Sequence, residues 1–127
     1  MESSFQFKNP VIKNLVFVLN EDFKIDGENQ INIPHKLSSS VEKHSDNMAT
    51  VSLTVEIGEE NSNYPFYILA IEESMFKWDG NIKDEDPLLS QNAPALLLSY
   101  LRPIVATVTA ASRYGSYNLP FINFKEK

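Results

Sequence analysis

The stretch APALLLSYLRPIVATVTAAS, residues 93–112, decides the fold, because it is the longest part of the chain with almost no charge. Twenty such residues are about the length that a membrane-spanning helix needs. Arg102 and Pro103 lie in the middle of the stretch, however, and a central arginine costs about 2.5–3.5 kcal/mol on insertion scales. We therefore predict a buried helix and no membrane insertion.

Drawn at 3.6 residues per turn, this helix has an apolar face and an uncharged face. The apolar face, which we expect to pack on the core, consists of Leu97, Leu101, Ile104, Val105, Val108 and Ala111, with Arg102, Thr109 and Arg113 on the opposite side. Between them runs a strip of mostly small or uncharged residues, Leu96, Ser99, Pro103, Thr107 and Ala110. Small side chains let another backbone approach closely, so we interpret this strip as a contact between subunits. The alternative is a surface that merely carries little charge.

Upstream of this helix, apolar residues alternate with polar ones, which is the pattern of half-buried strands. The predicted strands are residues 3–19, with a break at Asn9-Pro10, and residues 37–43, 48–57 and 64–78. Beyond the break, the alternation places Val11, Leu15, Phe17 and Leu19 on one face and Ile12, Val16 and Val18 on the other. The pattern predicts an α+β fold, in which a four-stranded antiparallel sheet has one long C-terminal helix packed on one face.

Composition limits the class of protein. The chain has 127 residues, of which 43% are hydrophobic and 22% are charged, so residues 1–127 are predicted to form a single domain. The net charge of −6 and the lack of a basic cluster argue against nucleic acid as a partner. The chain has no cysteine for thiol chemistry, and its start, MESSFQFKNP, lacks the features of a signal peptide. We therefore expect a cytoplasmic protein.

No pattern of catalytic or ligand-binding residues stands out. His35 and His44 are isolated and are predicted to be solvated turn residues. The pairs Glu59-Glu60 and Glu72-Glu73 lack the companions that a metal site needs, and the glycines do not form a phosphate loop. We predict no cofactor, metal or catalytic residue. An enzyme or small-ligand binder built on a sheet and a helix is kept as an alternative from a different class.

The connection NEDFKIDGENQINIP, residues 20–34, is unusually long for one between two strands. It places Phe23, Ile25, Ile31 and Ile33 among charged residues. Long connections without regular structure are uncommon and are often functional. We therefore regard this connection as a candidate for the functional region.

The order of several segments resembles that of the SecB family of export chaperones. The segments are FQFKNPVIKNLVF at residues 5–17, IGEE at 57–60, FKWDG at 76–80, NAPALLLSYLRP at 92–103 and SRYGSYNLPFINF at 112–124. The residues in comparable places are Asn92, Pro94, Tyr100, Arg102, Arg113, Gly115, Leu119, Pro120, Asn123 and Phe124. No single motif is diagnostic, but the shared order and spacing cover most of the chain.

The resemblance implies an ATP-independent holdase that binds unfolded polypeptides in apolar grooves and supports protein export. It also implies a homotetramer, a dimer of dimers whose helices pack together through the uncharged strip. The predicted groove residues are Phe23, Ile25, Ile31, Ile33 and Trp78. The alternative for each of these residues is a local core position beneath a loop.

Two departures from the family pattern bear on the partner. In the family, an acidic patch contacts the translocation motor SecA, and Ile57 and Glu59 match one part of that patch. The acidic residues of its other part are replaced by Asn14 and Val18. The sequence also ends at Lys127, where the family continues into a second helix, so we expect a more open apolar surface. The alternative function is a dedicated SecB-like chaperone for one partner, such as an antitoxin, or a non-catalytic interaction protein.

Overall fold

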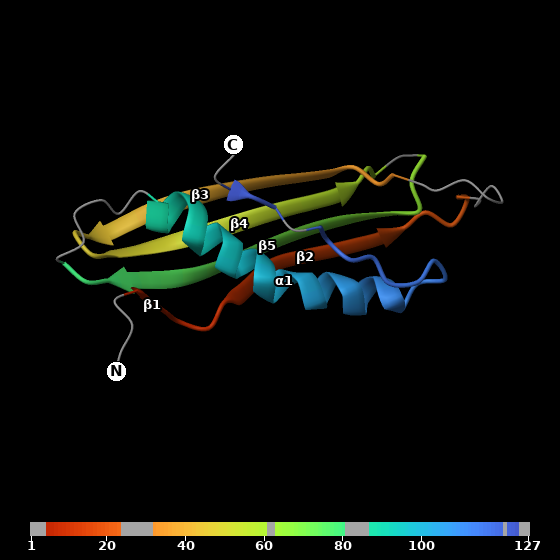
Figure 1. Ribbon diagram of the computed structural model, residues 1–127. Helices are drawn as coiled ribbons and strands as arrows, with labels where there is room; N and C mark the ends of the chain where they lie inside the picture. Colours follow the sequence, from red (N-terminus) through yellow and green to blue (C-terminus); the bar gives the residue numbers. More distant parts are fainter. Residues whose placement is uncertain (1–4, 24–31, 61–62, 81–86, 121, 125–127) are drawn as a thin grey trace.

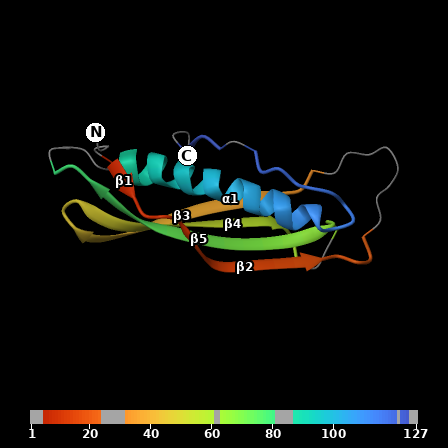
Figure 2. The same cartoon turned by 90° about the horizontal axis from the view of Figure 1, so that it is seen from below.

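The computed structural model describes residues 5–23, 32–60, 63–80, 87–120 and 122–124. The strands are β1 (Phe5–Phe7), β2 (Val11–Leu19), β3 (His35–Ser45), β4 (Met48–Gly58) and β5 (Phe66–Trp78). A turn of π-helix, η1 (Leu88–Asn92), leads directly into the helix α1 (Ala93–Ala110). The strands form one antiparallel sheet, and α1 lies across one of its faces (Figures 1 and 2). The predicted α+β fold is confirmed.

The central strand of the sheet is β5. It pairs with β4 along one side, and with β1 and then β2 along the other, while β3 pairs with the outer side of β4. The first predicted strand is divided in two at Asn9-Pro10, because proline has no N–H to donate to the ladder. Among the described residues, the sheet therefore has two open edges, one formed by β1 and β2 and the other by β3.

A β-bulge at Lys13 changes which side chains of β2 face α1. The register shifts after Ile12, and Ile12 pairs with Glu72, whose side chain is buried. Val11 pairs with Glu73 and therefore lies on the opposite face. The uninterrupted alternation had placed Ile12 and Val11 the other way round, and that prediction was wrong because an extra residue in a strand reverses the alternation.

The core lies between the sheet and α1. Alternate residues of β4, from Ala49 to Ile57, and of β5, from Phe66 to Trp78, are buried, as the period-two pattern predicts. From the helix, Leu97, Leu98, Leu101 and Val105 are buried against them. By length and composition alone, Leu88–Ala110 could span a membrane. In the fold, its apolar face covers the sheet.

The buried face of α1 differs in part from the predicted one. Ala111 is exposed, whereas Thr109, which was predicted on the far side of the helix, is fully buried. The Thr109 hydroxyl donates a hydrogen bond to the Val105 carbonyl at 2.8 Å and accepts one from the Tyr117 amide at 2.6 Å. Because the segment after α1 packs back on this side, the helix is covered by more than the sheet.

Candidate functional site

A cleft of about 680 Å³ opens at the end of the sheet where β2 enters the long connection and β4 turns into β5. Its lining combines apolar side chains with four exposed carboxylates. The apolar part consists of Val18, Leu19, Phe23, Phe66 and Tyr67, and the acidic part consists of Glu21, Asp22, Glu59 and Glu60. Asn20 and Asn63 complete the lining. We call this the acidic cleft.

Asn20 fixes the start of the connection against the β4–β5 turn. Its backbone amide donates to the Pro65 carbonyl at 2.9 Å, and its side-chain amide donates to the Tyr64 carbonyl at 3.0 Å. Its side-chain oxygen accepts a hydrogen bond from the Asp22 amide at 3.1 Å, as in an Asx turn. These bonds hold the acidic residues that follow β2 at one wall of the acidic cleft.

The turn after α1 supports the same wall from behind. The Tyr114 hydroxyl lies 3.1 Å from the carbonyl oxygens of both Asn20 and Phe23, and its ring contacts the Phe23 ring edge-on at 5.7 Å. The guanidinium of Arg113 donates to the Glu21 carbonyl at 2.6 Å. Phe23 therefore lines the acidic cleft with one side while the other is packed on the helix end.

The acidic cleft continues towards β3 as a smaller hollow of about 230 Å³, which shares Glu59, Glu60 and Tyr67 with it. The Tyr67 hydroxyl donates to the Glu56 carboxylate at 3.2 Å. Burial raises the pKa of the Tyr67 phenol, and the hydrogen bond to Glu56 and the charges of Glu56 and Glu60 raise it further. Carboxylates beside apolar side chains suit an extended polypeptide segment that carries both apolar and basic residues.

The open edge formed by β1 and β2 is apolar. Five of the six large hydrophobic residues that are exposed among the described residues lie on it or beside it, namely Phe7, Val11, Leu15, Val18 and Tyr100. The rings of Phe7 and Tyr100 meet edge-on at 6.0 Å, so the patch extends from the strand onto α1. The β3 edge is different, since Val41 is its only exposed large hydrophobic residue and Lys36, Glu42 and Lys43 accompany it.

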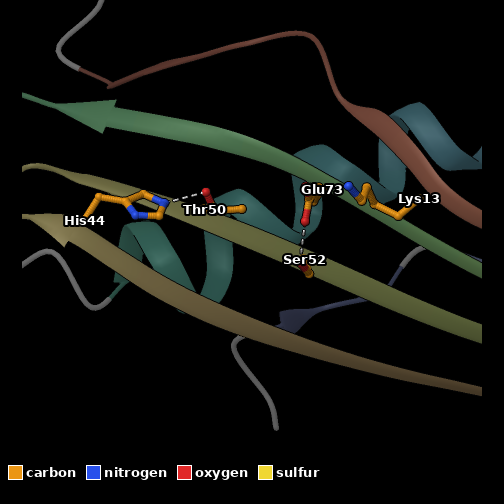
Figure 3. Close-up of polar contacts among 5 residues, drawn as sticks. All are labelled: Lys13, His44, Thr50, Ser52 and Glu73. Atoms are coloured by element: carbon orange, nitrogen blue, oxygen red, sulfur yellow. Dashed lines mark hydrogen bonds and ion pairs between the residues drawn. The ribbon is translucent and has the colours of Figure 1, made fainter.

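The face of the sheet opposite α1 carries polar contacts that join the strands (Figure 3). His44 on β3 is hydrogen-bonded to Thr50 on β4 at 2.7 Å, and the Ser52 hydroxyl donates to the Glu73 carboxylate at 3.3 Å. The Lys13 ammonium lies 3.6 Å from the same carboxylate. No group of three His, Asp or Glu side chains that could hold a metal ion occurs in the described part of the chain.

The structure brings only some of the predicted groove residues together. Phe23 lines the acidic cleft, whereas Ile33 is half-buried and packs on the core. Trp78 is buried at the far end of β5, where it pairs with β1. Ile25 and Ile31 lie outside the described residues. That these residues bind clients stays a prediction.

The two residues that matched the acidic patch of the family are placed differently. Ile57 is fully buried in the core, so its side chain does not reach the surface, whereas Glu59 is exposed and lines the acidic cleft. In the uncharged strip of α1, Leu96 is half-buried and the other four residues, Ser99, Pro103, Thr107 and Ala110, are exposed. The strip therefore lies on the outer side of the helix, where a partner could reach it.

Sequence reasoning missed several residues of the acidic cleft. Phe66 and Tyr67 read as ordinary strand residues, and Tyr114 belongs to a turn far away in sequence. The Asn20-Glu21-Asp22 run after β2 is a turn signal that could have marked one wall. Which apolar residues would meet it could not be read without the pairing of β2 with β5.

The SecB family model, described as preprotein translocase subunit SecB, matches residues 1–126. No curated protein matches the chain by sequence. The solved structures with a similar fold include the following two. The first is the SecB-like chaperone Rv1957 of Mycobacterium tuberculosis, solved in complex with a ChAD peptide from the Rv1956 HigA1 antitoxin. It has a TM-score of 0.74 and 10% sequence identity, over 94% of this chain and 91% of that one.

The second is a protein of unknown function from Streptococcus agalactiae, with a TM-score of 0.57 and 11% identity. The similarity covers 92% of this chain and 97% of that one. At these identities, both likenesses concern the fold alone. Both extend over nearly the whole of this chain, so the sheet and α1 are matched together.

Proposed function

Because this chain belongs to the SecB family, we propose that it is a non-enzymatic, ATP-independent chaperone that holds non-native polypeptides in the cytoplasm. The observation that carries the proposal is the acidic cleft, which places apolar and acidic side chains together at the end of the sheet. Non-native segments expose apolar residues, and the carboxylates favour those with lysine or arginine nearby. The chain's net charge of −6 also steers basic clients towards it.

The proposal predicts that the protein suppresses aggregation of a chemically denatured model protein at near-stoichiometric ratios without nucleotide. Light scattering measures this directly. Val18→Asp places a charge in the apolar lining and should raise the ratio needed for half-suppression several-fold, because an extended client would have to bury that carboxylate.

Val41→Asp is the matched control for this experiment. Val18 and Val41 are 42% and 43% exposed, respectively, and both lie on edge strands, but Val41 is on β3, away from the acidic cleft. Equal suppression by the two variants would contradict the role of the cleft. Undiminished aggregation in the presence of the wild type would contradict the proposed function itself.

We further propose that the protein is a homo-oligomer, a dimer of dimers. An exposed apolar edge strand offers unpaired backbone groups for another strand, and natural proteins usually protect such edges. Lys13 is the single charged residue of β2, and it is engaged with Glu73. A second copy that pairs β2 with β2 about a twofold axis would continue the sheet and cover Phe7 and Leu15.

The mass in solution tests each of the two proposed interfaces. Leu15→Lys introduces a charge at the paired β2 edge, and Thr107→Glu introduces one on the uncharged strip of α1. Each variant should leave dimers, because the other interface is kept. Light scattering coupled to gel filtration measures both. Val41→Lys on the β3 edge is the control and should keep the wild-type mass. An unchanged mass for Leu15→Lys would place the contact elsewhere.

A second candidate function is that of a dedicated chaperone for one partner. The structurally similar Rv1957 was solved with a peptide from an antitoxin, which favours a single aggregation-prone client of that kind for this chain too. Export is the other possibility within the family, and there Glu59 is the exposed residue that matches the SecA-binding patch. A pull-down with the full chain from its own cells separates the two, since it yields either one major partner or SecA with many clients.

A further inference from the structure

The residues that follow α1 form a strap along the helix. The chain reverses at Gly115, whose φ of +83° belongs to the left-handed region, and the described residues of 116–124 then run back on the side of α1 towards β3 (Figures 1 and 2). This strap has an extended backbone that joins no strand of the sheet among the described residues. The strap is therefore held by its contacts with α1 and the core and not by pairing with a strand of the sheet.

Apolar side chains and main-chain hydrogen bonds hold the strap. Leu119 is fully buried, Phe124 is nearly so, and the ring of Tyr117 meets that of Phe66 edge-on at 6.0 Å. The Tyr117 amide donates to the Thr109 hydroxyl, and the Arg102 guanidinium donates to the Leu119 carbonyl at 2.8 Å. Side-chain pockets combined with main-chain bonds are the means by which proteins bind extended peptides.

The fit of the strap is incomplete. A hollow of about 110 Å³ separates Ile122 from the helix residues Leu98, Ser99 and Arg102. A second hollow of about 330 Å³ lies beside Phe124 and the start of α1. Both hollows border the strap, so they leave room beside it for larger side chains of another segment.

We propose that the trough beneath the strap is a second polypeptide-binding site, which the chain's own strap occupies until a client segment displaces it. This inference rests on the proposed chaperone function. An extended segment can detach without breaking the ladder of the sheet or the hydrogen bonds of α1, so its opening is local. The strap competes at a high effective concentration because it is tethered, which makes it an autoinhibitory contact.

The strap also indicates the chemistry of the segment that would replace it. Residues 116–124, SYNLPFINF, contain no charge, and their described apolar residues lie at positions 117, 119, 122 and 124. The trough therefore suits an uncharged extended segment with large apolar side chains at this spacing. The acidic cleft suits basic segments instead. The two sites would therefore bind different segments of one client, the basic ones in the cleft and the uncharged ones in the trough.

The test uses the full chain and a fluorescent peptide of sequence SYNLPFINF. Leu119→Ser in the full chain weakens the strap but leaves the trough unchanged, because Leu119 is a fully buried residue of the strap. It should increase the affinity for the peptide at least about tenfold over the wild type, because the strap then competes less well. A peptide with serine at the positions of Leu119 and Phe124 is the control and should not bind. An unchanged affinity of Leu119→Ser would overturn the proposal.

A reversible disulfide between α1 and the strap, which we call the lock, provides a second test. Thr109 Oγ1 and the Tyr117 nitrogen lie 2.6 Å apart, which brings the two Cα atoms within reach of a disulfide, roughly 4.4–6.8 Å. The chain has no other cysteine, so Thr109→Cys with Tyr117→Cys can form a single internal bridge. The oxidised protein should bind the peptide at least about tenfold more weakly than the same protein after reduction.

Equal binding before and after reduction would show that the strap does not have to move, and the inference would be wrong. Suppression of aggregation by the wild type is measured in parallel. If the wild type suppresses aggregation while the lock has no effect on peptide binding, the chaperone function stands and the strap inference falls. If the wild type does not suppress aggregation, the proposed function fails on its own.

Discussion

Glu72→Gln is expected to abolish a loss of stability that the wild type undergoes as the pH rises from about 4.5 to 8. Glu72 is 1% exposed, lies between Ile12 and Leu53 on the covered face of the sheet, and has one carboxylate oxygen without a hydrogen-bond partner. Burial raises the pKa of this carboxyl from 4.5 to about 7. A charge without compensation in such a place opposes folding.

The direction in which stability changes with pH follows from the pKa values of Glu72 in the unfolded and the folded state. Below the unfolded value, both states hold the proton and the residue contributes no pH dependence. Between the unfolded and the folded value, only the native state keeps the proton, so the free energy of unfolding falls as the pH rises. Above pH 7 the loss is complete, at up to about 3 kcal/mol for the shift from 4.5 to about 7.

Urea unfolding of the wild type and of Glu72→Gln at pH 5 and pH 8 measures the fall in the free energy of unfolding. Glu73→Gln is the matched control, since Glu73 is the next residue but faces the other side of the sheet, where it meets Lys13 and Ser52. The control should keep the wild-type fall in stability between the two pH values. A fall of equal size in Glu72→Gln would show that the carboxyl is not the group that titrates.

Gly58→Ala is expected to destabilise the protein by at least about 3 kcal/mol. Gly58 ends β4 with a φ of +75°, a conformation that costs other residues free energy. A β-carbon there would lie 2.1 Å from the Phe66 carbonyl oxygen, which belongs to the backbone of β5 and cannot turn aside. The substitution would therefore push apart the two central strands beside the acidic cleft.

Gly115→Ala separates the conformational cost of a positive φ from the steric cost of the added methyl group. Gly115 has a similar φ of +83°, but nothing lies within 4 Å of an added β-carbon. Its substitution should cost only the conformational part, about 1–2 kcal/mol. Thermal unfolding of both variants gives the difference. Similar losses for the two would mean that the β4–β5 turn relaxes around the new methyl group.

The strands and the helix could be predicted because each has a clear period. The alternation from Ala49 to Ile57 and the uncharged stretch of α1 describe the covered sheet and the helix that covers it. The bulge at Lys13 and the burial of Thr109 could not be predicted, since both depend on partners that are distant in sequence. Local patterns carry no record of such partners.

The candidate site was harder to predict for the same reason. Phe23 was singled out because apolar residues in a charged connection stand out, and it lines the acidic cleft. Trp78 stands out equally in the sequence, but it is a core residue at the opposite end of β5. The acidic cleft is assembled from the ends of three strands, so only the pairing of β2 and β4 with β5 defines it.

The pairing of the other strands with β5 also bears on the order in which the chain folds. Neighbours in sequence, β3, β4 and β5, pair with one another as a meander, whereas β1 and β2 pair with β5 from about half the chain's length away. Contacts between distant residues cost more loop entropy and tend to form late. During synthesis, β1 and β2 therefore leave the ribosome first but are expected to join the sheet after β3, β4 and β5 have paired. Until then, the protein that we propose to be a chaperone is itself a non-native polypeptide with exposed apolar residues.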